Sequence, residues 1–102
     1  MRLKHKYHAQ RCEDDGIKFA SKREKYWYNL LKIQQKAGDV LFFLRQVPID
    51  LPGHTTYRCD FMVFYSNGEM AFLDVKGMQT PMFIMKKKQV EDLYPITIEC
   101  VK

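Results

Sequence analysis

Apolar side chains between residues 21 and 37 recur every three or four positions, and this period predicts an amphipathic helix. Ser21 and Glu24 have the spacing of a capping box, in which the serine side chain and the glutamate stabilise the first helical turn. Gly38 follows the last periodic residue and is expected to end the helix, because glycine adopts the left-handed conformation needed there.

A second helix is expected to begin at Pro81, because Thr80 has a side chain suited to the N-cap and proline favours the first helical position. This helix extends to about residue 93, where Tyr94 and Pro95 stop it. Residues 96–101 then alternate between apolar and polar side chains, which predicts a last strand.

Three strands are expected between the two helices. Residues 40–44 form an apolar run that extends to about residue 51, and Pro48 places that strand at a sheet edge or a bulge. Residues 57–65 are apolar on both faces, which indicates a strand covered on both sides. Residues 66–68 read Ser-Asn-Gly and predict a hairpin turn, with residues 70–76 as the returning strand. The predicted order is α-β-β-β-α-β, an α/β fold.

Length and composition then narrow the class of protein. A chain of 102 residues with 46% hydrophobic residues is expected to form one domain over residues 16–102, preceded by a basic arm over residues 1–15. No apolar run is long enough to cross a membrane, and no secretory signal is recognisable. Three widely spaced cysteines favour a reducing compartment, so a cytoplasmic location is expected. The net charge of +5 favours an anionic partner such as DNA.

The register of the predicted hairpin decides whether two aspartates meet. A two-residue turn places Asp60 opposite Val75, on the wrong face for contact with Asp74. A three-residue turn over residues 66–68 places Asp60 directly opposite Asp74, with a continuous strip of apolar pairs beside them. Gly68 in the left-handed conformation suits this second turn, which the pattern therefore favours.

Two adjacent carboxylates repel each other unless a proton or a cation lies between them. Oxygen ligands without a nearby histidine suit Mg²⁺ or Mn²⁺, so Asp60 and Asp74 are candidate metal ligands. Lys76 lies on the same face of its strand as Asp74. From there its ammonium could orient a water molecule and offset charge on a bound phosphate.

Other polar positions allow two interpretations each. Glu24 is either a helix cap or a fourth active-site group, since its helix could direct it at the metal. The run Lys86, Lys87 and Lys88 is either a solvated helix face or a track for DNA phosphates. Further candidate DNA contacts lie in the arm, at Arg2, Lys4 and Lys6.

The predicted order and these residues resemble the PD-(D/E)XK, or restriction-endonuclease-like, nuclease superfamily. Its signature is an Asp on the second core strand and an Asp or Glu two residues before a Lys on the third. Here the signature residues are Asp60, Asp74 and Lys76, while Cys59 stands where the superfamily often has proline. The resemblance implies a mixed sheet with helices on both faces.

The chain is also similar to a small phage-borne family of that superfamily. The resemblance covers roughly residues 16–101, and its matching stretches are 16–24, 37–38, 45–48, 57–61, 74–77, 80–81 and 94–95. It implies an active site of Glu24, Asp60, Asp74 and Lys76, in which the Val75 carbonyl is a further metal ligand. It also places Gln46 of the first core strand beside the site, where it is a candidate DNA contact.

The resemblance implies an Mg²⁺- or Mn²⁺-dependent DNA endonuclease, a phosphodiester hydrolase of phage recombination or replication acting in the cytoplasm of the bacterial host. Related phage and archaeal members resolve Holliday junctions as dimers, so branched DNA and a homodimer are the expectations by analogy. The alternative is a non-catalytic DNA-binding module of the same fold. Paired carboxylates argue against it, because they repel phosphate and serve no purpose in binding alone.

Overall fold

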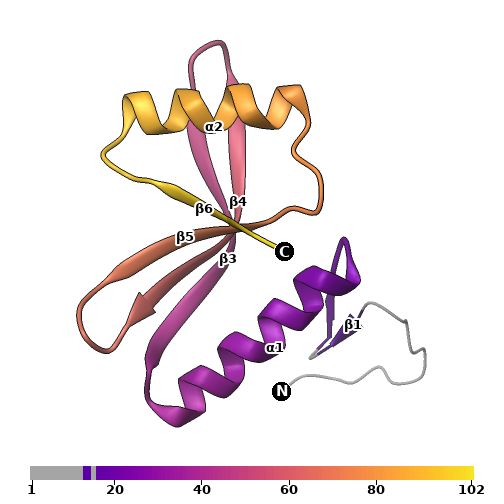
Figure 1. Ribbon diagram of the computed structural model, residues 1–102, viewed down its shortest axis with the longest axis vertical. Helices are drawn as coiled ribbons and strands as arrows, with labels where there is room; N and C mark the ends of the chain where they lie inside the picture. The colour runs from indigo at the N-terminus through magenta and orange to yellow at the C-terminus, as the bar shows by residue number, and fades with distance from the viewer. Residues whose placement is uncertain (1–12, 15) are drawn as a thin grey trace.

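The computed structural model describes residues 13–14 and 16–102, and it shows an α/β protein (Figure 1). The elements in chain order are β1 (Glu13–Asp14), β2 (Ile17–Lys18), α1 (Lys22–Ala37), β3 (Val40–Leu51), β4 (Thr55–Tyr65), β5 (Met70–Val75), α2 (Pro81–Leu93) and β6 (Ile98–Val101). From α1 onward this is the predicted order, so the α-β-β-β-α-β arrangement is confirmed.

The main sheet has four strands in the order β3-β4-β5-β6. The first three strands are antiparallel and β6 runs parallel to β5, so the expected mixed sheet is confirmed. β3 forms one edge of this sheet, as expected for a strand that contains Pro48. Proline has no backbone N–H to donate, and an edge strand has a side on which no neighbouring strand needs that donor.

β1 and β2 form a separate two-stranded antiparallel sheet just before α1. The expectation of an irregular arm is therefore wrong for Glu13 and Asp14, because these residues pair with Lys18 and Ile17. The rest of the predicted arm, residues 1–12 and 15, lies outside the described residues.

Both predicted helix starts are confirmed by their caps. The Ser21 side chain accepts a hydrogen bond from the Glu24 backbone N–H at 3.1 Å, and Thr80 accepts one from Phe83 at 3.2 Å. Gly38 ends α1 with φ of 92°, in the left-handed region. In the described part of the chain, no helix is long and apolar enough to cross a membrane.

The hairpin between β4 and β5 has the three-residue turn that the sequence favours. The Tyr65 N–H donates to the Glu69 carbonyl at 2.8 Å, and Phe61 pairs with Leu73 further along the ladder. Gly68 has φ of 95°, the left-handed conformation that this turn requires. In this register Asp60 and Asp74 occupy opposite positions on neighbouring strands.

The helices bury two separate apolar clusters. The first contains Leu31 of α1 with Phe61, Val63 and Leu73, and the second contains Phe83 and Val90 of α2 with other strand residues, among them Tyr57, Cys59 and Phe72. Since Phe72 and Leu73 are consecutive in β5, the two helices cover opposite faces of that strand. Helices on both faces are therefore confirmed at β5.

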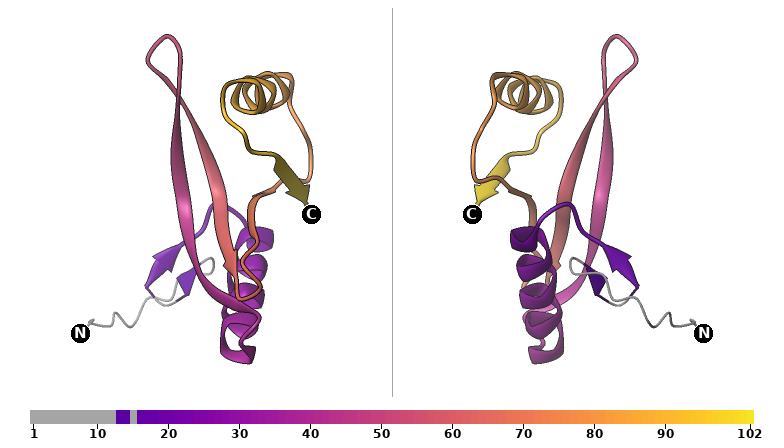
Figure 2. Two further views of the ribbon diagram at one scale, coloured as in Figure 1. Left: turned by 90° about the vertical axis from the view of Figure 1, so that its left-hand side faces the viewer. Right: turned by 90° about the vertical axis from the view of Figure 1, so that its right-hand side faces the viewer.

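Along β4, however, the two helices share one side. Cys59 belongs to the α2 cluster and Phe61 to the α1 cluster, although residues two apart in a strand point the same way. Figure 2 shows both helices on the same side of the long β3–β4 hairpin, one at each end. The change from one core to the other therefore falls at Asp60, the residue between them.

We predict that Gly68→Ala lowers the free energy of unfolding by about 1 kcal/mol, because an L-residue at this φ is strained. Gly77→Ala is the matched control. A Cβ at either position meets nothing within 4 Å, but only Gly68 has a positive φ. Urea unfolding measures both variants, and equal stability of the two would contradict the assigned turn.

Candidate active site

The candidate site lies at a fork in the sheet. The β4–β5 ladder ends at Phe61 and Leu73, while β4 continues with only β3 as a neighbour. One position beyond this last pair, carboxylate oxygens replace backbone carbonyls as the hydrogen-bond acceptors between the strands. The Asp60 N–H donates to Asp74 Oδ1 at 3.2 Å, and the Val75 N–H donates to Asp60 Oδ2 at 2.9 Å. The two aspartates are thereby held against each other.

Asp74 is fully buried, yet its second carboxylate oxygen, Oδ2, has no hydrogen-bond partner among the described residues. Burial raises the pKa of Asp74, and the nearby charge of Glu24 raises it further. The Lys76 ammonium and the Asp60 N–H lower the pKa but do not cancel the effect of burial. A buried, under-partnered carboxylate is unfavourable for folding and is therefore a candidate for a functional role.

Asp60 is linked to Glu24 through one side chain. Gln46 Nε2 donates to Glu24 Oε2 at 2.7 Å and to Asp60 Oδ1 at 3.2 Å. Gln46 lies opposite Asp60 on β3, and its backbone has φ of 51°, unusual for a residue other than glycine. Strained backbone of this kind is concentrated at functional sites. The predicted place of Gln46 beside the site is thus what the structure shows.

Glu24 is placed for both roles that the sequence left open, the helix cap and the active-site group. Its backbone N–H donates to Ser21, as a helix cap requires, and its Oε1 accepts from the Ala20 N–H at 3.2 Å. Its Oε2 points into the site, where it accepts from Gln46 and forms an ion pair with Arg45 at 3.3 Å. With 3% of its surface exposed, Glu24 is nearly as buried as Asp74.

Lys76 lies on the side of the aspartates that faces α2. Its Nζ is 3.9 Å from Asp74 Oδ1 and 4.9 Å from the ring centroid of Phe83. Its side chain is 30% exposed, so the ammonium reaches both the buried carboxylate and the surface. The structure therefore brings all four predicted active-site residues, Glu24, Asp60, Asp74 and Lys76, to one fork.

Cys59 supports the fork from the buried side. Its Sγ lies 3.4 Å from the carbonyl oxygens of both Phe61 and Leu73, which belong to the two strands that separate there. Burial raises the pKa of Cys59 to about 11, so the thiol stays protonated and acts as a donor. Cys59 thus makes hydrogen-bonding contacts with both β4 and β5.

The donor set fits a hard divalent cation. Asp60 and Asp74 supply oxygen atoms only, as would the Val75 carbonyl that the resemblance adds, and Asp74 Oδ2 is an unused buried acceptor. Within residues 13–14 and 16–102, no three side chains of His, Cys, Asp or Glu are grouped to hold a metal by themselves. Mg²⁺ does not require such a group, since it commonly binds through one or two carboxylates and keeps several waters.

The predicted DNA contacts on α2 do not form one row. Lys86 Nζ donates to the Thr56 carbonyl on β4 at 3.3 Å, whereas Lys87 forms an ion pair with Glu91 of α2 at 3.2 Å. Lys88 is exposed. Only Lys86 is therefore directed toward the strand that carries Asp60. Arg2, Lys4 and Lys6 lie outside the described residues.

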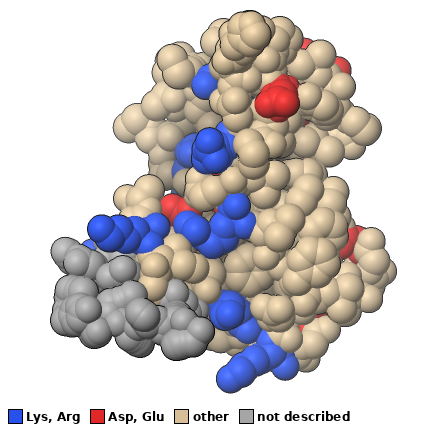
Figure 3. Space-filling view, turned by 180° about the vertical axis from the view of Figure 1, so that it is seen from behind, with Lys and Arg blue, Asp and Glu red and all other residues tan. Residues whose placement is uncertain are grey.

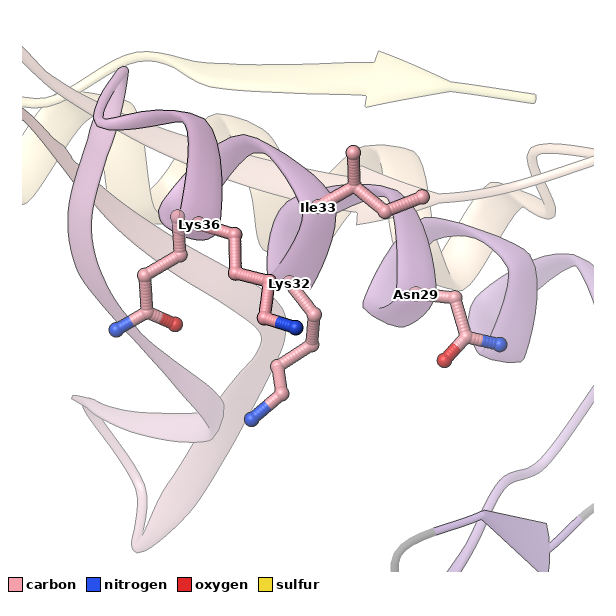
Figure 4. A pocket seen from close by; sticks show the side chains of 5 residues that line it. Asn29, Lys32, Ile33 and Lys36 are labelled. Atoms are coloured by element: carbon pink, nitrogen blue, oxygen red, sulfur yellow. The ribbon is translucent and has the colours of Figure 1, made fainter.

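One face of the molecule carries mixed charge. Figure 3 shows several Lys and Arg side chains distributed down one face, with a small acidic area between them. A separate hollow lies on α1. Its volume is about 640 Å³, and the described residues that line it are Asn29, Lys32, Ile33, Gln35 and Lys36 (Figure 4). None of these is an acid, so this hollow is separate from the carboxylate site.

Arg45 is the site residue to which the sequence analysis assigned no role. Its guanidinium lies 4.7 Å from the ring centroid of Phe19 as well as against Glu24. The available signal was the pair Arg45–Gln46, which interrupts an otherwise apolar strand. Two consecutive long polar side chains in such a strand indicate a buried polar partner, here Glu24.

Fold and site together define a small α/β protein with a buried carboxylate cluster at a strand fork. The chain belongs to the family described as "Protein of unknown function (DUF1064)", whose model matches residues 4–100. No curated protein matches the chain, and no solved structure matches it either.

We predict that Asp74→Asn stabilises the metal-free protein by about 1 kcal/mol at neutral pH, because it removes a buried charge and keeps the acceptor for the Asp60 N–H. Thermal unfolding in EDTA measures the gain. Asp92→Asn, at an exposed position on α2, is the control and leaves stability unchanged.

We also predict how the difference in stability between Asp74→Asn and the wild-type protein depends on pH. Because the pKa of Asp74 is raised in the folded state, its protonated form is favoured by folding. The stabilisation from protonating Asp74 is therefore complete below pH 3.8, the ordinary pKa of the carboxyl, and it is lost as pH rises through the raised pKa of the folded state. The advantage of Asp74→Asn over the wild type should therefore shrink on acidification. A pH-independent difference would contradict the assignment.

Proposed function

We propose that this protein is an Mg²⁺-dependent endonuclease that hydrolyses phosphodiester bonds in DNA. The observation that supports this most directly is the fully buried Asp74, whose free Oδ2 lies beside a second carboxylate and within reach of a lysine. A purely structural role does not explain the free oxygen, since a buried carboxylate oxygen without a hydrogen-bond partner destabilises the fold. The resemblance to the PD-(D/E)XK superfamily points to the same four residues.

In this proposal each residue of the fork has a distinct task. Asp60 and Asp74, with the Val75 carbonyl, would hold the cation, which when bound lowers the pKa of a water molecule and offsets phosphate charge. The Lys76 ammonium faces the bound phosphate and stabilises the negative charge that grows on it. Water attacks phosphorus in line, and the bond to the 3′ oxygen breaks, which leaves a 3′-hydroxyl and a 5′-phosphate.

Glu24 and Gln46 act one step away from the cation. Gln46 uses one amide nitrogen to hold both Glu24 and Asp60, so it keeps the Asp60 carboxylate oriented toward Asp74. Arg45 balances the charge of Glu24 from the other side. We therefore assign Gln46 a positioning role, in addition to the contact with DNA that the resemblance suggests.

The proposal includes selectivity for DNA structure. The described elements form a four-stranded sheet, a small two-stranded sheet and two helices, and within the described residues there is no separate part that would read base sequence. Recognition is therefore proposed to depend on the DNA backbone and shape, with branched DNA such as Holliday junctions as the preferred substrate and a homodimer as the assembly. The role in phage recombination or replication is part of the same proposal.

The central experiment incubates the protein with a four-way junction, a flap, a linear duplex and an RNA hairpin, each with Mg²⁺, Mn²⁺ or EDTA. We expect cleavage of branched DNA that requires the metal. Asp60→Asn should abolish it, and Lys76→Ala should slow it by about 10²-fold or more, the size typical of losing one group that stabilises developing charge. Asp92→Asn is the matched control.

Metal-independent DNA binding without cleavage of any substrate would reject the nuclease and favour a non-catalytic DNA-binding module. Cleavage that survives Asp60→Asn would reject the assigned site, whatever the substrate.

Glu24→Gln separates the two roles of Glu24. Glutamine still accepts the Ala20 N–H hydrogen bond, so the helix cap is kept, but the half-buried Arg45 guanidinium loses its charged partner and the thermal midpoint should fall. We expect at least a tenfold fall in kcat with KM for DNA nearly unchanged. Unchanged kcat would show that Glu24 only stabilises the helix.

A further inference from the structure

A second feature lies beyond the carboxylates, between the start of α2 and the part of β4 that has no β5 neighbour. It is a cavity of about 440 Å³, a size within the range of small-ligand sites. Residues from β4, from the segment between β5 and α2, and from α2 line it. It therefore occupies the space that opens where the two strands separate.

The charge of this cavity is one-sided. Arg58, Lys76 and Lys86 line it, and none of the residues that line it is an aspartate or a glutamate. Lys86 donates only to the Thr56 carbonyl, and Arg58 forms no ion pair with any carboxylate in the described part of the chain. Two of the three cations thus lack an acidic partner, which makes the cavity suited to an anion.

Two of the cations that line the cavity lie beside the carboxylate pair, each two residues farther from the hairpin turn than the aspartate on its own side. Arg58 lies two residues from Asp60 on β4, and Lys76, the first residue after β5, lies two residues from Asp74. Side chains two apart in a strand share a face, so the two cations continue the row that the two aspartates begin. Lys76 belongs to both groups, since its Nζ is near Asp74 and its side chain lines the cavity.

The remaining wall is largely apolar. Tyr57 and Phe83 lie against each other with ring centroids 6.2 Å apart, and the Tyr57 hydroxyl is buried without a hydrogen-bond partner in the described residues. Met78 and Met82 also line the cavity and are 77% and 63% exposed. Cations next to an apolar wall suit a phosphate that carries an organic group, better than they suit a free inorganic ion.

We propose that this cavity binds one nucleotide of the nucleic-acid strand, next to the phosphodiester at the carboxylates. Arg58 and Lys86 contact its phosphate, and the methionines contact its sugar or base. This inference rests on the proposed function for the direction of the strand. The binding itself requires neither the metal nor cleavage, so it can be tested separately.

The test measures binding of a fluorescein-labelled single-stranded dT oligonucleotide in EDTA, by anisotropy at several salt concentrations. We expect Arg58→Ala and Lys86→Ala each to weaken binding about three- to tenfold and to lower the salt slope by about 0.7, the value for one phosphate contact on a single strand. Lys36→Ala is the control, since it removes one exposed charge at the far end of α1. Equal losses in all three variants would show a general charge effect and overturn the proposal.

A second measurement identifies the bound group. Thymidine 5′-monophosphate and thymidine are titrated separately, over the same concentrations, into isotope-labelled protein. The change in each backbone amide NMR signal is recorded. Larger shifts with the monophosphate at Arg58, Thr80 and Phe83 support the phosphate site. Equal shifts, or none, overturn it.

The outcomes distinguish this inference from the nuclease proposal. If no substrate is cleaved but Arg58→Ala and Lys86→Ala lose binding, the cavity is confirmed and the enzyme is rejected. If branched DNA is cleaved and both variants retain the wild-type KM, the enzyme is supported and the cavity is rejected.

Discussion

The arrangement of this protein depends on two hydrogen bonds in which carboxylates replace the backbone ladder. Asp74 accepts the Asp60 N–H, and Asp60 accepts the Val75 N–H, at the point where β4 and β5 separate. Backbone donors left open at a fork must find acceptors, and here the acceptors are the acids themselves. The contacts that end the ladder therefore also hold two carboxylates together, with one buried oxygen left without a partner.

The fork also marks the boundary between the two apolar cores. Below it Phe61 packs under α1, and beyond it Cys59 packs under α2, so each helix anchors one side of Asp60. α1 contributes Glu24, and Phe83 of α2 lies against Lys76. A site built at such a boundary is rigid because both cores support it. It also accumulates unfavourable burial of charge, which a bound cation would relieve.

The nuclease proposal and the cavity proposal describe successive parts of one surface. The carboxylates repel an approaching phosphate unless a cation is bound, whereas Arg58, Lys76 and Lys86 attract one without it. A strand that places one phosphate among the cations brings its neighbour toward the acids. In the two proposals together, Lys76 is the residue that would couple strand position to the reacting group, since it lies near Asp74 and also lines the cavity.

The elements from α1 onward and the helix ends followed from the sequence, which also favoured the observed hairpin register, because caps, alternation and the preference of Gly68 for a left-handed turn act over a few residues. The convergence of Asp60, Asp74 and Lys76 followed from that register. Only the tertiary structure decided that Glu24 meets Arg45 and Gln46, that Asp74 keeps a bare oxygen, and that Lys86 and Lys87 have different partners. These depend on how α1 and α2 pack against strands distant in sequence, and no local pattern encodes that approach.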